Sequence, residues 1–279
     1  PIKILYIVDI AQTMHFKQLF KGAERFPWYH GEGEHVWFGR MHMKDGQMST
    51  RKGNVVLLND VIDEAVKRAG DVIREKSHNV ENKEKIAQTI GIGSVKYSIL
   101  SQNRTTDIVF DWDKMLSLES NSAAYLQYTY ARAKSILRKK DEEVDRAPAS
   151  TSMTALTPAS APIPTSTLTS ASIIPENTAN NPPSQASPEN AEQKINLLMR
   201  LIPKFEEQIA IAGQEFKPNI LCNYLYKLAQ DFNSFYNSVP VLKAEKKADR
   251  EFRLKLVEAV SQVMKNGLAI LGIEVVEEM

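Results

Sequence analysis

The chain has 279 residues, of which 43% are apolar, and a formal net charge of +1. This length suffices for one large or two ordinary domains with packed cores. The near-neutral charge excludes a protein-wide basic field, so any binding of nucleic acid must depend on local patches. A single cysteine excludes an internal disulfide framework and favours a reducing cytoplasm. No apolar run approaches the roughly 18 residues of a membrane-spanning helix, so no membrane partner is expected.

Strand-like runs alternate with turns over residues 1–58. The chain starts at Pro1, without Met or a signal peptide, and enters at once on a strand-like run, so we expect the natural N-terminus to lie upstream. Asp45-Gly46 predicts a tight turn. Runs rich in β-branched and aromatic residues predict strands at Lys3–Asp9, His35–Phe38 and Val55–Leu58.

Residues 59–146 have the apolar spacing of helices. Asn59 or Asp60 can cap a first helix, and Asn121 or Ser122 can cap a second that reaches about Lys140. The apolar residues of the first recur at helical spacing: Ile62, Ala65, Val66, Ala69 and Ile73. The predicted core stripe of the second consists of Leu126, Tyr130, Ala133 and Leu137.

Residues 147–190 break this pattern. Eight of the thirteen prolines lie here among Ser, Thr, Ala and Asn, with no Lys, Arg or Asp. Such a segment cannot bury enough apolar surface to offset its ordering entropy, so we expect a disordered insertion in a helix–helix connection.

Residues 191–279 are predicted to be helical again. Pro218 suits the first turn of a helix, Cys222 has the surroundings of a buried structural thiol, and Gly267 can end the last helix. Two apolar faces are expected, one with Leu221, Leu225, Leu228, Phe232 and Phe235, the other with Phe252, Leu256, Val260 and Val263.

The segment Met48-Ser-Thr-Arg-Lys-Gly-Asn54 follows a turn and precedes a predicted strand. Its hydroxyls, adjacent cations and glycine suit a loop that binds a polyphosphate, because cations and free amides meet negative charge. Taken alone, such a basic segment is more often a solvated surface turn.

Several motifs together resemble one family. The loop at 48–54 is similar to the arginyl-tRNA synthetase version of the class I "KMSKS" loop. Further matches occur in order at Tyr6–Phe16, Gly91–Tyr97, Phe110–Asp113, Tyr125–Tyr128 with Ala131-Arg132, and Gly267–Ile273. The resemblance covers the chain except the Pro/Ser/Thr stretch.

The resemblance implies roles for residues near the catalytic part. Gln12 matches a position that contacts arginine, at the carboxyl end of a strand; the alternative is an ordinary polar turn residue. His15 matches a position near the adenosine site; it could equally be a capping or core histidine. The loop implies ATP-phosphate contacts from Met48 and from the candidate catalytic residues Ser49, Thr50, Arg51 and Lys52. Gln47 and Thr50 replace the usual lysines, so either Lys52 or Arg51 supplies the cation.

Tyr125, Tyr128 and Arg132 are spaced i, i+3, i+7, which places them on one helix face. Aromatic faces beside a cation suit unstacked RNA bases and phosphate, and the alternative is that both tyrosines pack against another helix of the bundle. The resemblance adds Tyr236 and Met279 as residues that border the anticodon, although a frayed terminus is the alternative for Met279.

The predicted fold is mostly α: the C-terminal part of an α/β Rossmann-like catalytic domain (1–58), then an all-α helical bundle that binds the anticodon (59–146 and 191–279), interrupted by the insertion at 147–190. The class I "HIGH" motif does not occur in the 279 residues. The resemblance therefore implies an arginine–tRNA ligase in a longer parent chain, with this chain inactive alone.

The resemblance implies three partners: arginine-accepting tRNA, L-arginine, and ATP, which binds as a substrate with Mg²⁺. The implied protein is a cytoplasmic monomer without a tightly bound cofactor or a metal site. One alternative is a stand-alone, non-catalytic tRNA-binding module, which an upstream reading frame with the missing half would exclude. Another is a helical interaction protein unrelated to tRNA, which predicts no ATP-loop signature.

Overall fold

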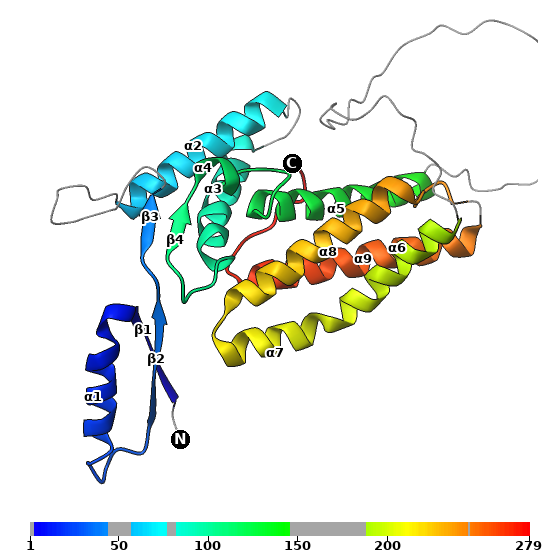
Figure 1. The fold of residues 1–279 in the computed structure, drawn as a ribbon. Helices are drawn as coiled ribbons and strands as arrows, with labels where there is room; N and C mark the ends of the chain where they lie inside the picture. Colours follow the sequence, from blue (N-terminus) through cyan, green and yellow to red (C-terminus); the bar gives the residue numbers. More distant parts are fainter. Residues whose placement is uncertain (1–2, 44–56, 77–81, 146–187, 245) are drawn as a thin grey trace, which may run out of the picture.

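The fold comes from a computed structural model, which describes residues 3–43, 57–76, 82–145, 188–244 and 246–279. The predicted ATP loop, the turn at Asp45-Gly46 and most of the predicted insertion lie outside these residues. The described part is mostly helical, with two small sheets, as predicted (Figure 1). No helix among the described residues is long and apolar enough to cross a membrane.

The first sheet pairs two parallel strands, β1 (Lys3–Asp9) and β2 (Glu32–Phe38). They are joined by a 3-10 turn, η1 (Ile10–Gln12), and helix α1 (Thr13–Ala23). The Tyr6 ring lies 5.0 Å from that of Phe16 and 5.4 Å from that of Phe20, which packs α1 on one face of the sheet. Both predicted strands are confirmed, and β2 starts three residues earlier than expected.

The second sheet pairs β3 (Met41–Met43) with β4 (Ile108–Phe110), again in parallel. A close approach at Gly39 connects it to the first sheet, because a Cβ there would lie 2.2 Å from the carbonyl oxygen of Thr106. Only glycine has room for this turn of the chain. The bend directs the chain from β2 along β4 and towards residues 48–54.

Helices α2 (Leu58–Lys76) and α3 (Lys83–Leu100) form a closely packed pair. Gly91 of α3 faces α2, and a Cβ at this position would lie 2.7 Å from the Cα of Val66. The missing side chain lets the two backbones meet. Ala65, Ala69 and Ile73, which belong to the predicted apolar face of α2, are buried.

The predicted start of α2 is wrong. Leu58, which we placed at the end of a strand, is the first helical residue, and Asn59 and Asp60 lie within the first turn rather than at the cap. The amide of Val61 donates to the carbonyl of Leu57, so the backbone already follows a helical path there. Leu57 and Leu58 are 59% and 64% exposed, and therefore pack into no sheet.

Most of the remaining helices form the bundle that dominates Figure 1. The bundle consists of α5 (Ala123–Asp145), α6 (Pro188–Leu201), α7 (Phe205–Glu215), α8 (Pro218–Ser238) and α9 (Lys247–Ile270), with a 3-10 turn η3 (Ile202–Lys204) before α7, whereas the short α4 (Trp112–Met115) packs on α3. As predicted, Ser122 caps α5, since its Oγ accepts from the amide of Tyr125, and α8 begins at Pro218. Helix α6 begins at Pro188, so the last three residues of the predicted insertion are helical.

The main core lies between α5, α8 and α9, with α6 packed alongside. Leu126, Tyr130 and Ala133 of the predicted stripe are buried, and Leu137 packs partly against the same core. The predicted end of the last helix is wrong, because α9 continues past Gly267 to Ile270. Gly267 instead gives room to Leu225, while Gly272 takes the positive φ of 69° that follows the helix.

Candidate nucleic-acid interface

Five side chains from α5 and α8 gather at the surface of the bundle. We call them the α5–α8 cluster: Tyr125, Tyr128 and Arg132 from α5, and Asn233 and Tyr236 from α8. All five are partly exposed. The predicted single face of α5 is therefore formed as expected, and Tyr236 joins it from the neighbouring helix.

Arg132 lies at the centre of this cluster. Its guanidinium carbon is 4.7 Å from the ring centre of Tyr128 and 5.3 Å from that of Tyr236. Its NH2 group donates to the Tyr128 hydroxyl (2.7 Å), and NH1 donates to Oδ1 of Asn233 (2.8 Å). No carboxylate pairs with it among the described residues, so the positive charge is held in place by aromatic rings and an amide.

Tyr125 combines a packing role with an exposed edge. Its ring meets that of Tyr226 on α8 at 5.5 Å, edge to face, and its hydroxyl accepts from Nδ2 of Asn233 (2.9 Å). Burial raises the pKa of the Tyr125 phenol above its ordinary value. Tyr125 therefore packs in part against another helix, which was the alternative to a role in binding RNA. The Tyr128 hydroxyl instead contacts Arg132 of its own helix.

The C-terminal segment lies along α5 and ends at Met279, which is partly buried rather than frayed. Nε2 of Gln127 donates to the carbonyl of Glu274 (2.8 Å), and Arg138 donates to that of Glu277 (3.1 Å). Met279 packs against a buried cluster that includes Ala124, the neighbour of Tyr125. Hydrogen bonds to α5 and the packing of Met279 therefore hold the C-terminal segment against the helices.

Gln12 and His15 follow the carboxyl end of β1, where ligands bind in parallel sheets. Gln12 is exposed, stands at the N-cap position of α1 and makes no capping hydrogen bond. His15 is also exposed, with its ring edge-on to Phe16 at 5.3 Å, so it is neither a cap nor a core residue. Both side chains are free to meet a ligand at this edge.

Asp107 holds the chain that leads to the predicted ATP loop. Its Oδ1 accepts from the amide of Arg40 (2.8 Å), and its Oδ2 lies 3.2 Å from Nε2 of His42. The bond from the Arg40 amide, followed by that from His42, lowers the pKa of Asp107. The loop residues Met48, Ser49, Thr50, Arg51 and Lys52 lie outside the described residues.

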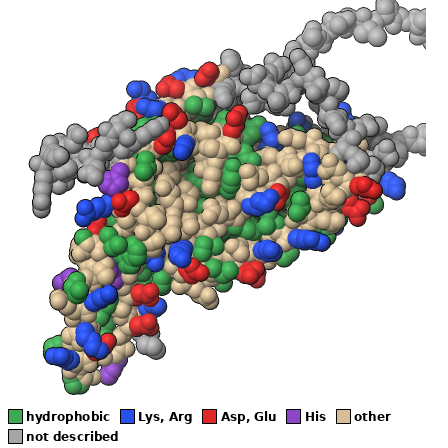
Figure 2. All heavy atoms as spheres, viewed as in Figure 1, with side chains coloured by type: hydrophobic (Ala, Val, Ile, Leu, Met, Phe, Trp, Pro, Cys, Tyr) green, Lys and Arg blue, Asp and Glu red, His purple; other side chains and the backbone are tan. Residues whose placement is uncertain are grey.

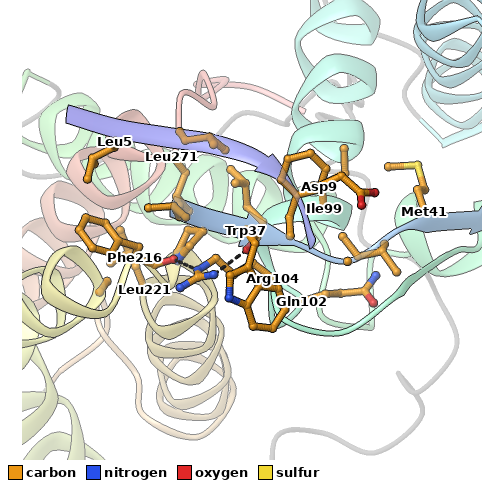
Figure 3. A pocket seen from close by; sticks show the side chains of 18 of the residues that line it. Leu5, Asp9, Trp37, Met41, Ile99, Gln102, Arg104, Phe216, Leu221 and Leu271 are labelled. Carbon is orange, nitrogen blue, oxygen red and sulfur yellow. Dashed lines mark hydrogen bonds between the residues drawn. The ribbon is translucent and has the colours of Figure 1, made fainter. Parts of the chain in front are cut away.

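A cavity of about 870 Å³ lies between the β1–β2 sheet and the ends of α3, α7, α8 and α9 (Figure 3). Its walls are mainly apolar, and none of the residues predicted to bind substrate lines it. Arg104 closes one side, where Nε donates to the carbonyl of Phe216 (2.7 Å) and NH1 to that of Trp37 (2.6 Å). The arginine thus connects β2 with the turn between α7 and α8.

Charge on the surface agrees with the composition. On the face shown in Figure 2, Lys and Arg side chains alternate with Asp and Glu and form no continuous basic patch. Among the described residues, no group of three His, Cys, Asp or Glu side chains is arranged to hold a metal ion. The face in this view therefore offers no broad basic surface for nucleic acid.

Asn233 was not among the predicted site residues, although it forms hydrogen bonds with Arg132, Tyr125 and Thr129. A signal was present, because Asn233 and Tyr236 are spaced i, i+3 and so share a helix face. A second signal is the polar side chain of Asn233 at the edge of an apolar face, since Phe232 and Phe235 on either side of it in the sequence are fully buried. Thr129, whose Oγ1 accepts from Asn233, gave no such signal.

Two family models match the chain in succession. The model described as "tRNA synthetases class I (R), catalytic domain" matches residues 2–112, and that described as "DALR anticodon binding domain" matches residues 166–279. The chain belongs to the arginyl-tRNA synthetase family. The catalytic-domain match extends beyond residue 58 and includes α2 and α3, which the sequence predicts as part of the anticodon-binding bundle.

Individual relatives agree with this assignment. The chain is 38% identical to the Arginine--tRNA ligase of Fusobacterium nucleatum and 37% identical to that of Proteus mirabilis, in each case over 99% of the chain and 42% of the relative. The arginyl-tRNA synthetase of Thermus thermophilus has a similar structure, with a TM-score of 0.74 and 28% identity over 99% of this chain and 41% of that one. The chain thus spans less than half the length of these family members.

Proposed function

We propose that this chain supplies the ATP-signature loop and the anticodon-binding surface of an arginine–tRNA ligase, which uses ATP to attach arginine to its tRNA. The α5–α8 cluster carries the proposal, because Arg132 lies there between two tyrosine rings without a carboxylate partner among the described residues. Unstacked bases need aromatic faces, and phosphates need cations. Relatives with the name Arginine--tRNA ligase support this substrate class.

In the proposed tRNA site, Tyr125 and Tyr128 present aromatic faces, and Arg132 contacts a phosphate. Tyr236 borders the same surface from α8, and Met279 borders it from the C-terminus. Four of these residues contact one another or Asn233. Met279 packs against a separate buried cluster, so its role rests on the resemblance alone.

In the proposed ATP site, Ser49, Thr50, Arg51 and Lys52 stabilise the phosphates during adenylate formation, together with Met48. This part rests on the sequence motif and on the catalytic-domain match over residues 2–112. Gln12 contacts arginine and His15 lies near the adenosine, since both are exposed at the carboxyl end of β1. Magnesium enters with ATP, where it would share the phosphate charge.

Binding of tRNA by the full 279-residue chain tests the anticodon surface. Tyr128→Ala should weaken the binding of an arginine-accepting tRNA about ten-fold or more, because base–aromatic stacking is worth roughly 1–3 kcal/mol per base. Arg132→Ala should weaken binding. It should also reduce the slope of log K against log salt concentration by about 1, as expected on losing one phosphate contact. Arg200→Ala, at an exposed position of α6, is the matched control for loss of a positive charge.

The same variants need a test of folding. Circular dichroism melts should show unchanged helicity for Tyr128→Ala, whose side chain is only partly buried. If Tyr128→Ala unfolds the bundle and binding is lost only in proportion, the tyrosine is a core residue and Tyr236 becomes the next candidate. If the wild-type chain does not bind tRNA, the proposed anticodon surface is wrong.

We propose that the 279 residues alone do not form arginyl-adenylate, because they contain no "HIGH" motif to position ATP with the loop. Arginine-dependent exchange of pyrophosphate into ATP measures this step directly. Exchange above the protein-free blank would contradict the proposal. The division into a catalytic part up to residue 58 and a bundle after it, the cytoplasmic location and the monomeric state stay predictions.

The alternative of a stand-alone tRNA-binding module receives less support. It does not require the match to a catalytic-domain model over residues 2–112, nor the phosphate-loop sequence within that match. An interaction protein unrelated to tRNA is disfavoured for the same reason and by the match of residues 166–279 to an anticodon binding domain.

A further inference from the structure

Asn233 on α8 forms hydrogen bonds with three residues of α5: Arg132, Tyr125 and Thr129. Its Oδ1 accepts from Arg132 at 2.8 Å. Its Nδ2 donates to the Tyr125 hydroxyl at 2.9 Å and to Oγ1 of Thr129 at 3.0 Å. One amide on α8 therefore contacts three consecutive turns of the facing helix.

The chemistry of the neighbours fixes which way this amide points. A guanidinium carries only donors, so the atom of Asn233 that faces Arg132 must be the oxygen. The NH₂ group then faces Tyr125 and Thr129. The Thr129 hydroxyl donates to the backbone carbonyl of Tyr125 (2.8 Å), which leaves its oxygen to accept from Asn233.

This orientation determines the roles of the two tyrosine hydroxyls. The oxygen of Tyr125 accepts from Asn233, and the oxygen of Tyr128 accepts from Arg132. Neither phenolic proton has an acceptor among the described residues, and the same holds for the remaining N–H groups of Arg132. The phenolic protons of Tyr125 and Tyr128 and the remaining guanidinium N–H groups are therefore donors that the cluster leaves available.

We propose that Asn233 is a positioning residue that sets this hydrogen-bond polarity, so that Tyr125, Tyr128 and Arg132 recognise acceptor oxygens of single-stranded RNA. The inference rests on the proposed function of the cluster in tRNA binding. The acceptor belongs either to a phosphate or to a base carbonyl, since both present oxygens and no donor. A group that presents only a donor in the same place would leave these protons without an acceptor and would bind less tightly.

Asn233→Ala and Asn233→Asp test the inference in the full chain, with an arginine-accepting tRNA as the probe. Alanine removes the hydrogen bond that holds Arg132 in position. Aspartate still accepts from Arg132, but it also accepts a hydrogen bond from the Tyr125 hydroxyl, and its negative charge offsets the positive charge of the guanidinium. Each should weaken tRNA binding about ten- to a hundred-fold, as expected on losing a charge-assisted hydrogen bond.

Asn237→Asp is the matched control for the added charge. It lies one helical turn further along α8 and is exposed. A surface charge of this kind should change binding by less than about five-fold. A synthetic anticodon stem-loop with abasic sites in the loop distinguishes the two sources of oxygen: the effect of Asn233→Ala persists on this RNA if the acceptor is a phosphate and disappears if it is a base carbonyl.

The pKa of Tyr125 gives a readout that needs no RNA. It is obtained from the tyrosinate absorbance during a pH titration, after subtraction of the same titration of the protein that also carries Tyr125→Phe. A donor to the phenol oxygen stabilises the phenolate, so the pKa of Tyr125 should rise in Asn233→Ala. If the amide instead accepted the phenolic proton, its removal would lower that pKa. A fall in the pKa of Tyr125 would overturn the inference even if the variant binds tRNA poorly.

The outcomes separate the two proposals. If the wild-type chain binds tRNA and both Asn233 variants bind as tightly as Asn237→Asp, the role of Asn233 is wrong and the tRNA surface stands. If the wild-type chain does not bind, the proposed function fails and the inference fails with it. Weaker binding by both Asn233 variants, together with a raised pKa of Tyr125 in Asn233→Ala, supports the inference.

Discussion

Cys222 lies fully buried in α8, and burial raises the pKa of its thiol to about 12 from an ordinary 9.0. The neutral thiol therefore stabilises the fold at a pH below 9.0, and this contribution is lost as the pH rises through about 12. We expect no reaction with Ellman's reagent in the native chain at about pH 8, because the thiolate is the nucleophile. The thiol should react fully once the chain is unfolded in guanidinium. Rapid reaction of the folded chain would mean that Cys222 is accessible between its helices.

Lys52 is the single residue on which the ATP-site proposal depends most. In an enzyme that also provides the "HIGH" motif, Lys52→Ala should slow adenylate formation more than it weakens tRNA binding, since a cation in a preorganised site is worth about 2–4 kcal/mol. Pyrophosphate exchange and tRNA binding are measured on the same preparation. Arg51→Ala is the companion variant, and an unchanged exchange rate for Lys52→Ala would assign the cation to Arg51.

Helices α2 and α3 depend on the absence of a side chain at Gly91. A Cβ there would lie 2.7 Å from backbone atoms of Val66, which cannot move without moving the helix. Gly91→Ala should therefore destabilise the chain by about 1–3 kcal/mol. The matched control is Gly213→Ala in α7, where nothing lies within 4 Å of the added carbon.

Urea unfolding of both variants measures the difference. Gly213→Ala should be neutral or gain roughly 0.5–1 kcal/mol, because alanine is the better helix former. Equal stability of the two variants would show that α2 and α3 separate at little cost, contrary to their close packing.

The Pro/Ser/Thr-rich segment connects α5 to α6, and its dispensability is a prediction from composition alone. A deletion of residues 149–187, closed by a short Gly/Ser linker, keeps Pro188 at the start of α6. The thermal midpoint should change little, because the loop-closure penalty grows slowly with length. A large fall in the midpoint would mean that the segment packs on the bundle.

The sheet region and the bundle are connected through Arg104, whose donors reach the carbonyls of Trp37 and Phe216. All three tryptophans lie at or before residue 112, so tryptophan fluorescence reports on the N-terminal region, while circular dichroism is dominated by the helices. Arg104→Ala should lower the fluorescence midpoint in urea relative to the circular dichroism midpoint. Three hydrogen bonds from a charged donor are lost, and the two shorter ones, to Trp37 and Phe216, are worth about 1.5–3 kcal/mol each.

Arg104→Lys should not restore the coupling, because a single ammonium cannot reach both carbonyls with the geometry of a guanidinium. Arg25→Ala, at an exposed site after α1, serves as the control for charge. Coincident midpoints in Arg104→Ala would show that other contacts around the cavity hold the two regions together.

The sequence by itself determined the features that local spacing encodes. The strand at Lys3–Asp9, rich in β-branched and aromatic residues, and the apolar stripe from Leu126 to Ala133 were predicted correctly, because each depends on residues close in the chain. The motifs also determined the family. Where a local signal had two possible uses, as for Gly267 or the start of α2 at Leu58, the sequence predicted the wrong one.

Only the tertiary structure decided which distant side chains meet. Asn233 contacts Arg132 because α5 and α8 pack side by side, and no pattern within either helix states the rotation that brings these two positions together. Packing also decided that Gly267 makes room for Leu225 rather than ending its helix. Such contacts depend on the shapes of both partners at once, whereas sequence patterns report on one segment at a time.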